Sequence, residues 1–283
     1  MQTVKLRPMS DLLRTYLSAL PALWIADTAR YLVAAALMAA IVAVFWRAGL
    51  AARKLQARHA TGRDIRREIL ASLRSSLVFS LLAAGVFVAA QQGWFTIYWG
   101  FGRAGPLYLV LSLAFMLVAH DTWFYWTHRA MHRPRLFAIF HRTHHLSRTP
   151  TAWAAYSFSV PEAIVQGAFV PLFLVFMPMH EIAVLLFLVV QIGRNVMGHC
   201  GVEVHPAAFG PGRWLGWNTT TTHHDLHHET SRYNYGLYFR WWDKMMGTEH
   251  PDYRRKFEAI ATRPPPFATA ARTEALGTPT TPT

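Results

Sequence analysis

The sequence predicts an all-α, polytopic membrane protein with about four to five transmembrane helices and a cytoplasmic helical cap that holds a histidine-rich site for two metal ions. Three observations support this fold class. Hydrophobic residues make up 53% of the 283 residues, more than is usual for a soluble domain. Five long apolar runs follow one another along the chain. Histidines at spacings of three and four recur close to the ends of these runs.

The apolar runs are long enough, or nearly so, to cross a bilayer, whose core needs about 20 residues of helix. They are residues 31–46, 76–101, 107–126, 160–179 and 182–196. The fifth run is marginal in length, and a re-entrant segment is its alternative. The fourth contains Pro161, Gly167 and Pro171, which membrane helices tolerate better than soluble helices do. Buried core helices of a soluble protein are the alternative for the whole set, but so many runs in one short chain favour membrane spans.

Basic residues predict the orientation in the membrane. The connection after the first run is rich in them, with Arg47, Arg53, Lys54, Arg58, Arg63, Arg66, Arg67 and Arg74. The connection between the second and third runs has only Arg103, and the connection between the fourth and fifth has no Lys or Arg. Because cytoplasmic loops carry an excess of Lys and Arg, the first connection should be cytoplasmic. Alternating spans then place every histidine cluster on the cytoplasmic side.

Composition predicts three regions along the chain. Residues 1–29 mix leucines with basic side chains and are expected to form an amphipathic interfacial segment. Residues 30–262 form the membrane-embedded domain. Residues 263–283 are rich in Pro and Thr and are expected to be disordered.

The net charge of +13 favours anionic lipid headgroups as the counterpart, because much of it lies in the connections next to the apolar runs. We expect no binding of nucleic acid. The single cysteine, Cys200, excludes an intrachain disulfide framework and fits a reducing compartment.

Three histidine clusters carry the chemistry. They are His128 with His132, then His141, His144 and His145, then His224, His227 and His228, while His199 lies between the second and third. Residues three and four apart lie on one face of a helix, so each cluster is expected to direct its imidazoles at one spot. One zinc ion uses at most four such ligands, so two metals sharing the set is the simpler interpretation. Imidazole suits iron, zinc, copper and nickel, and spacing alone does not choose among them.

Carboxylates near the clusters are expected to support the metal site. Asp121, Glu162 and Asp225 are placed to orient the imidazole rings by accepting their free N–H protons, and Glu229 is a weaker candidate for the same role. Helix capping or solvation is the alternative for each of them.

The residues by themselves leave the reaction open. A metal pair at the face of a membrane suits a lipid-like substrate. Hydrolysis by paired zinc and oxidation of a C–H bond by iron are both compatible with such a site. A metal transporter or sensor is a third alternative, although its ligands would be expected within the spans and the clusters here follow them.

A family resemblance narrows these alternatives. The segments that carry it are residues 120–132, 140–145, 224–228 and 234–248, which contain the three histidine clusters and an Asn-Tyr-Gly sequence at residues 234–236. In this order they resemble the fatty acid hydroxylase and sterol desaturase superfamily over roughly residues 105–260. The membrane-embedded domain is therefore expected to be fatty acid hydroxylase-like.

The resemblance implies a non-haem di-iron oxygenase that uses O2 and reducing equivalents to hydroxylate or desaturate a lipid such as a sterol or a fatty acyl lipid. Zinc is a possible substitute for iron in a purified sample, and a di-zinc membrane hydrolase remains the alternative function. The chain has no haem-binding motif, so an external ferredoxin, cytochrome or reductase would supply the electrons.

The resemblance also implies a ligand set. Carried over by position, the metal ligands are His128, His132, His141, His144, His145, His199, His224, His227 and His228. His120 and His223 fall at variable positions of the motif, and His205 is a possible tenth ligand.

Overall fold

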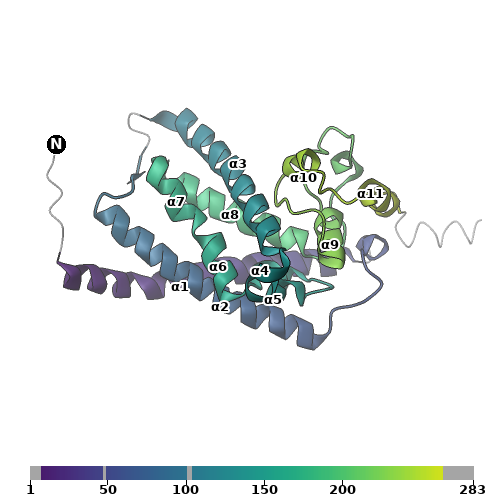
Figure 1. Ribbon diagram of the computed structural model, residues 1–283, viewed down its shortest axis with the longest axis horizontal. Coiled ribbons are helices and arrows are strands. Elements are labelled where there is room, and N and C mark those ends of the chain that lie inside the picture. The colour runs from purple at the N-terminus through teal and green to yellow at the C-terminus, as the bar shows by residue number, and fades with distance from the viewer. Residues whose placement is uncertain (1–7, 47–48, 101–103, 264–283) are drawn as a thin grey trace, which may run out of the picture.

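The computed structural model describes residues 8–46, 49–100 and 104–263, and it is built almost entirely of helices (Figure 1). Four helices of the described residues are long and apolar enough to cross a membrane: α1 Met9–Phe45, α2 Gly62–Gln91, α3 Gly105–Met131 and α8 Glu181–Gly198. The predicted all-α polytopic fold is therefore confirmed. The predicted disordered tail lies, apart from Arg263, outside the described residues.

The fourth apolar run does not form one spanning helix. It divides into α6 Val160–Gly167 and α7 Phe169–Phe176. Pro171 accounts for the break, because it has no N–H to pair with the carbonyl of Gly167 and its ring crowds that carbonyl. Gly167 is also tightly packed, since a β-carbon there would lie 2.6 Å from Leu82 Cδ1. Together the two helices still run from the histidine end of the molecule to the opposite end (Figure 1).

At that opposite end a short parallel pair of strands joins the connections. Strand β1 Ile97–Tyr98 pairs with β2 Met179–His180, with Ile97 opposite Met179. The pairing fixes the start of α8 relative to α3, because β1 precedes α3 and β2 precedes α8 directly.

Helix α1 runs through residue 29 without a break. It spans 37 residues with Pro21 inside, so the expected boundary between an interfacial segment and the membrane domain is not marked by a change in secondary structure. At 1.5 Å per residue the helix is about 55 Å long, which exceeds the apolar thickness of about 30 Å. Residues 1–7 of the expected interfacial segment lie outside the described part.

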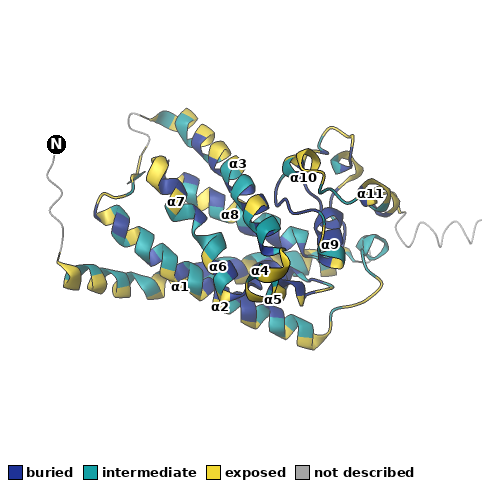
Figure 2. Cartoon of the chain, in the orientation of Figure 1, coloured by how far each residue is buried: buried dark blue, intermediate teal, exposed yellow. Residues whose placement is uncertain are grey.

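Many residues on the outside of the long helices are exposed (Figure 2), and many of these exposed residues are apolar. Leu13, Val33 and Leu37 on α1, Phe115 on α3 and Val189 on α8 are all exposed. In the most apolar 18-residue stretch of α1, only 11% of the residues are buried within the protein. A soluble protein would hide such helices in a core, so these surfaces fit contact with lipid tails.

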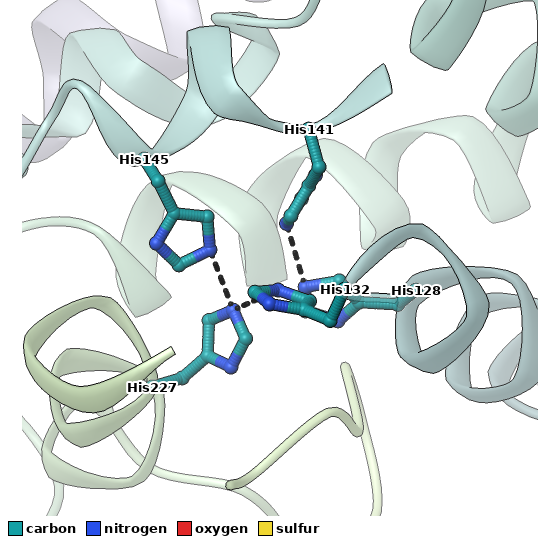
Figure 3. Close-up of side chains that lie close together, drawn as sticks. All are labelled: His128, His132, His141, His145 and His227. Atoms are coloured by element: carbon teal, nitrogen blue, oxygen red, sulfur yellow. Dashed lines mark hydrogen bonds between the residues drawn. The ribbon is translucent and has the colours of Figure 1, made fainter. Parts of the chain in front are cut away.

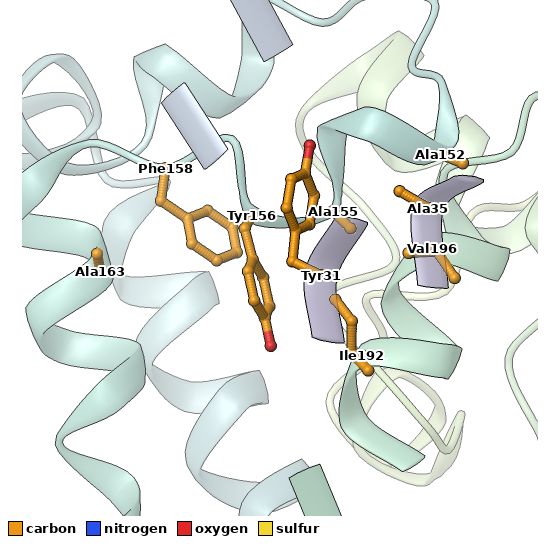
Figure 4. Close-up of a cluster of buried hydrophobic side chains, with 9 residues drawn as sticks. All are labelled: Tyr31, Ala35, Ala152, Ala155, Tyr156, Phe158, Ala163, Ile192 and Val196. Carbon is orange, nitrogen blue, oxygen red and sulfur yellow. The ribbon is translucent and has the colours of Figure 1, made fainter. Parts of the chain in front are cut away.

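A small core packs α1 against α6 and α8 beside the histidine end (Figure 4). Its centre is the 3-10 helix η2 Ala152–Tyr156, whose alanines allow close approach of the neighbouring helices. Tyr31 of α1 stacks on Tyr156 at 5.7 Å between ring centroids and donates a hydrogen bond to the carbonyl of Trp153. Phe158 of this core also packs against the ring of His144, so the core adjoins the histidine region.

The remaining helices form the cap. They are η1 Leu50–Arg53, α4 Pro134–Phe140, α5 Arg142–His145, η3 Ala207–Phe209, α9 Thr221–Thr230, α10 Trp241–Met245 and α11 Tyr253–Ala261. The basic connection after α1 and the first turns of α2 contact the histidine-bearing segments directly. Gln56 Nε2 donates to Asp225 Oδ1 at 2.7 Å, and Arg67 Nη2 donates to the Leu146 carbonyl at 2.9 Å. The basic connection and the histidines thus share one end of the molecule, as the charge pattern predicts.

Candidate metal centre

All nine histidines of the predicted ligand set lie in two neighbouring clusters. The five-histidine cluster consists of His128, His132, His141, His145 and His227 (Figure 3). The four-histidine cluster consists of His144, His199, His224 and His228. In each cluster one ring nitrogen per residue lies within 4.8 Å of all the others.

Helix geometry divides the histidines between the clusters. His141 and His145 are four residues apart and belong to one cluster, and His224 and His228 are four apart and belong to the other. Neighbouring residues on a helix point about 100° apart. His144, next to His145, therefore faces the four-histidine cluster, and His227, next to His228, faces the five-histidine cluster. The expectation that each sequence cluster points at one spot is therefore wrong for α5 and α9, which both serve two centres.

The five-histidine cluster joins the end of α3 to α5 and α9. His128 Nε2 lies 2.9 Å from His141 Nε2, while His227 Nε2 lies 3.0 Å from His145 Nε2 and 3.2 Å from His132 Nε2. Figure 3 shows these rings converging from three separate segments. His132 is partly exposed, whereas the other four are buried.

The four-histidine cluster is tighter and fully buried. His199, at the C-terminal end of α8, has its Nε2 2.9 Å from His224 Nε2 and 3.2 Å from both His144 Nε2 and His228 Nε2. His224 Nε2 and His228 Nε2 are also 3.2 Å apart. Phe158 packs against His144 with ring centroids 5.3 Å apart and gives this cluster an apolar wall.

These spacings fit a bound cation better than hydrogen bonds among the rings. The Nε2 atoms of His199, His224 and His228 form a closed triangle, and a ring nitrogen with at most one in-plane proton or lone pair cannot bond both neighbours well. Metal–imidazole bonds are about 2.1 Å, so ligands at right angles around one ion would be about 3.0 Å apart. The donor set therefore fits a metal in each cluster.

The outer ring nitrogens carry the protons that leave Nε2 free. His128 Nδ1 faces the Tyr235 carbonyl at 2.9 Å, His199 Nδ1 faces the Asn195 carbonyl at 2.7 Å and His227 Nδ1 faces the Tyr233 carbonyl at 2.7 Å. A carbonyl can only accept, so in these rings Nδ1 donates and the lone pair of Nε2 points into the cluster.

The clusters also favour the neutral, metal-binding form of imidazole. Burial comes first and repulsion between neighbouring rings second in holding the pKa of His141, His144, His224, His227 and His228 well below the usual value. Burial likewise lowers the pKa of His145 to about 3 and that of His199 to about 4. At neutral pH the rings are uncharged, which is the protonation state that binds metal.

The three predicted carboxylates have different partners. Glu162 Oε1 lies 2.6 Å from His141 Nδ1 and accepts a hydrogen bond from it. Asp121 instead accepts from the backbone N–H groups of residues 237–239, and Asp225 pairs with Gln56 and Lys256. Asp121 and Asp225 therefore anchor the segments that carry or flank α9, and among the three only Glu162 contacts a metal-cluster ring. Glu229 pairs with Lys256.

The other candidate histidines lie outside the clusters. His120 Nδ1 bonds the Tyr238 hydroxyl at 2.9 Å among aromatic rings. His205 Nδ1 pairs with Glu203 at 2.7 Å, and His223 Nε2 lies 3.4 Å from Asp243. None of the three belongs to a metal-binding group of the described residues.

Sequence reasoning missed the supports of the clusters. Glu203 and Asp243 are buried carboxylates that hold backbone around α9 and the Asn-Tyr-Gly turn. Asn234 has a positive φ of 61°, and its side chain donates a hydrogen bond to the His223 carbonyl, which links this turn to α9. The carbonyl acceptors leave no signal in the sequence, because every residue has a carbonyl.

Comparison with known proteins agrees with this geometry. Residues 113–248, which include all nine clustered histidines, match the fatty acid hydroxylase family. The chain is 30% identical over 187 residues to a Delta(7)-sterol 5(6)-desaturase of Gibberella zeae, covering 65% of this chain and 56% of that protein. It is 28% identical over 192 residues to a lathosterol oxidase of Rattus norvegicus, covering 66% of this chain and 62% of that protein.

A third relative broadens the range of chemistry. A methylsterol monooxygenase of Aspergillus fumigatus is 30% identical over 152 residues, which cover 50% of this chain and 49% of that protein. The chain thus spans between about half and two thirds of the length of these relatives. No solved structure matches it.

Proposed function

Because the chain belongs to the fatty acid hydroxylase and sterol desaturase superfamily, we propose that it is a membrane-bound non-haem di-iron oxygenase that hydroxylates or desaturates a lipid. The observation that carries the proposal is the convergence of nine buried or partly buried histidines in two clusters at one end of apolar helices. O2 would be the oxidant.

We assign one iron ion to each cluster. Imidazole binds zinc and iron alike, but removing hydrogen from an unactivated C–H bond needs the redox chemistry that iron supplies and zinc does not. The electrons would come from an external ferredoxin, cytochrome or reductase.

The protein's own residues hold the rings and keep water out. The carbonyls of Asn195, Tyr233 and Tyr235 fix the ring orientations, and Glu162 does the same for His141. The core around Tyr156 and Phe158 adjoins the clusters, where Phe158 packs against His144. Replacing such a partner of a metal ligand typically lowers metal affinity or activity by about 10-fold to 100-fold.

The substrate class follows from the membrane and the relatives. The exposed apolar helices favour a substrate that enters from the bilayer. The relatives are named for reactions on sterols, so we propose a sterol or a related polycyclic lipid as the first substrate to test. The basic connection beside the clusters supports a cytoplasmic location for them.

The test compares cells that produce the wild-type chain, the His144→Ala variant or the control variant His59→Ala. His59 is exposed and lies outside both clusters. Lipid mass spectrometry should detect a lipid with one more oxygen atom or two fewer hydrogen atoms in wild-type and His59→Ala cells, and none in His144→Ala cells. Iron content is measured on the purified proteins. Zinc-dependent hydrolysis without O2 would instead support the hydrolase and refute the oxygenase.

A further inference from the structure

The segment after His199 separates two hollows. On one side a cavity of about 10 Å³ is lined by seven polar residues, Arg194, Asn195, His199, His205, Thr219, Thr220 and His224, together with Met197, Gly198 and Leu237. On the other side a hollow of about 370 Å³ is lined by Arg53, Val204 and Arg263 among other residues. The small cavity touches two members of the four-histidine cluster and is about the size of one water molecule.

Glu203 is a buried carboxylate that accepts four hydrogen bonds in this segment. Its Oε2 accepts from the Thr222 N–H at 2.7 Å and the Thr222 hydroxyl at 2.6 Å. Its Oε1 accepts from the His205 N–H at 2.9 Å and from His205 Nδ1 at 2.7 Å. Although burial alone would raise it, the bonds from His205 and Thr222 hold the pKa of Glu203 below its usual value, so the group is an anion.

His205 connects this anion to the cavity. Because Nδ1 donates to Glu203, Nε2 is free to accept, and it lies 3.5 Å from Nη1 of Arg194. Both His205 and Arg194 line the small cavity. The adjacent Val204 lines the larger hollow, and Arg53 Nη1 donates to the His205 carbonyl. His205 thus lies between the small cavity, which it lines, and the larger hollow, which the adjacent Val204 lines.

The proposed reaction requires such a path. Hydroxylation converts R–H, O2, two electrons and two protons to R–OH and water, and desaturation consumes the same electrons and protons while forming two waters. The external electron donor supplies only the electrons. The clustered histidines are neutral metal ligands without a proton to give at Nε2, so protons must arrive from another group.

We propose that Glu203 and His205, through one water molecule in the small cavity, form the proton path to the four-histidine centre. This inference rests on the proposed function. His205 Nε2 first takes up a proton that enters from the side of the larger hollow. That proton passes to the cavity water, and the water passes a proton to the reacting oxygen. The ring then returns to its neutral form, with Nδ1 still donating to Glu203.

Charged groups of both signs face His205. The Glu203 carboxylate lies against Nδ1, the guanidinium of Arg194 lies near Nε2, and the more distant guanidinium of Arg53 bonds the backbone carbonyl. His199 and His224 face the same cavity from α8 and α9, and Phe209 of η3 covers the ring at 5.1 Å between centroids.

The test uses the metal-loaded protein and the variants His205→Gln, His205→Ala and Glu203→Gln, with His59→Gln as control. We expect kcat of His205→Gln to fall by about 100-fold with both metals retained. O2 consumption should be uncoupled from product formation, and added imidazole should restore turnover of His205→Ala. Glu203→Gln should shift the pH profile of kcat.

A second readout does not depend on activity. A high-resolution map of the zinc-loaded wild-type protein should show one ordered water in the small cavity, and an empty cavity would overturn the proposal. Wild-type turnover in His205→Gln would also overturn it, as would loss of metal from that variant, because His205 would then support the ligands. If the wild-type protein makes no oxidised lipid, the proposed function fails instead.

Discussion

The two histidine clusters differ in where their supports come from. The five-histidine cluster has one partly exposed member, His132, and one ring held by the carboxylate of Glu162. The four-histidine cluster is fully buried, has the Asn195 carbonyl behind His199 and borders a polar cavity. The first has a ligand to spare and lies nearer to the surface, while the second has the fewest ligands that close a metal site. The two centres should therefore respond differently to the same change.

The largest effect is expected from removing one ligand of the four-histidine cluster. His199→Ala leaves three imidazoles there, and we expect loss of one metal and a fall in activity of more than about 100-fold. His132→Ala leaves four imidazoles in the other cluster and should keep both metals. Metal analysis of the purified variants measures the difference. Equal metal loss in both variants would remove the distinction between the centres.

Low pH tests a property that the two clusters share, namely the resistance of their buried rings to protonation. The unfolded chain binds protons at the usual histidine pKa of about 6.5, but the folded rings resist protonation, so stability is present above this pH and is lost as the pH falls below it. At about pH 5.5 each such ring should lower the free energy of unfolding of the metal-free protein by about 1.4 kcal/mol. Thermal unfolding between about pH 8 and pH 5 measures this loss. A melting temperature that stays constant below pH 6.5 would contradict it.

Glu162→Gln tests a carboxyl group that, among the described residues, contacts a ring of the five-histidine cluster alone. The amide keeps the shape of the side chain but replaces the carboxyl group that bonds His141, so activity should fall by about 10-fold to 100-fold. Asp225→Asn is the matched control, because Asp225 bonds Gln56 and Lys256 and should change activity less. A larger loss of activity in Asp225→Asn than in Glu162→Gln would mean that the carboxylate on α9 is the more important of the two.

The smallest effect is expected at Ser231, whose hydroxyl lies 3.1 Å from His145 Nδ1. Ser231→Ala removes this neutral hydrogen bond and should lower activity by less than about 10-fold. The positive φ of 57° is unchanged for the new residue, so folding should be little affected beyond the wild-type strain. Steady-state turnover and iron content measure the effect. A loss as large as that of Glu162→Gln would make the hydroxyl as important as the carboxylate.

Much of this architecture could be predicted from the sequence. The apolar runs and the spacing of His224, His227 and His228 are local signals, and the resemblance supplied the full set of nine histidines. The break between α6 and α7 could also have been located, since Gly167 and Pro171 are visible in the sequence. The basic residues between α1 and α2 correctly predicted that this connection lies at the histidine end.

The division into two clusters could not be predicted. It depends on the opposite directions of His144 and His145, and of His227 and His228, relative to helices that meet only after folding. The partner of Asp121 was missed for a similar reason, because it is the backbone of residues 237–239, more than 110 positions away in the chain. A carboxylate near a histidine in sequence need not be near its ring in space.

The unequal contribution of α9 has a consequence for the order of assembly during synthesis. Before α9 emerges, the growing chain already holds four of the five histidines of the larger cluster but only His144 and His199 of the smaller one. Two imidazoles make a weak metal site, whereas four can close one. The larger centre can therefore capture its ion early, and the smaller one becomes complete only when the last membrane helix has been followed by α9.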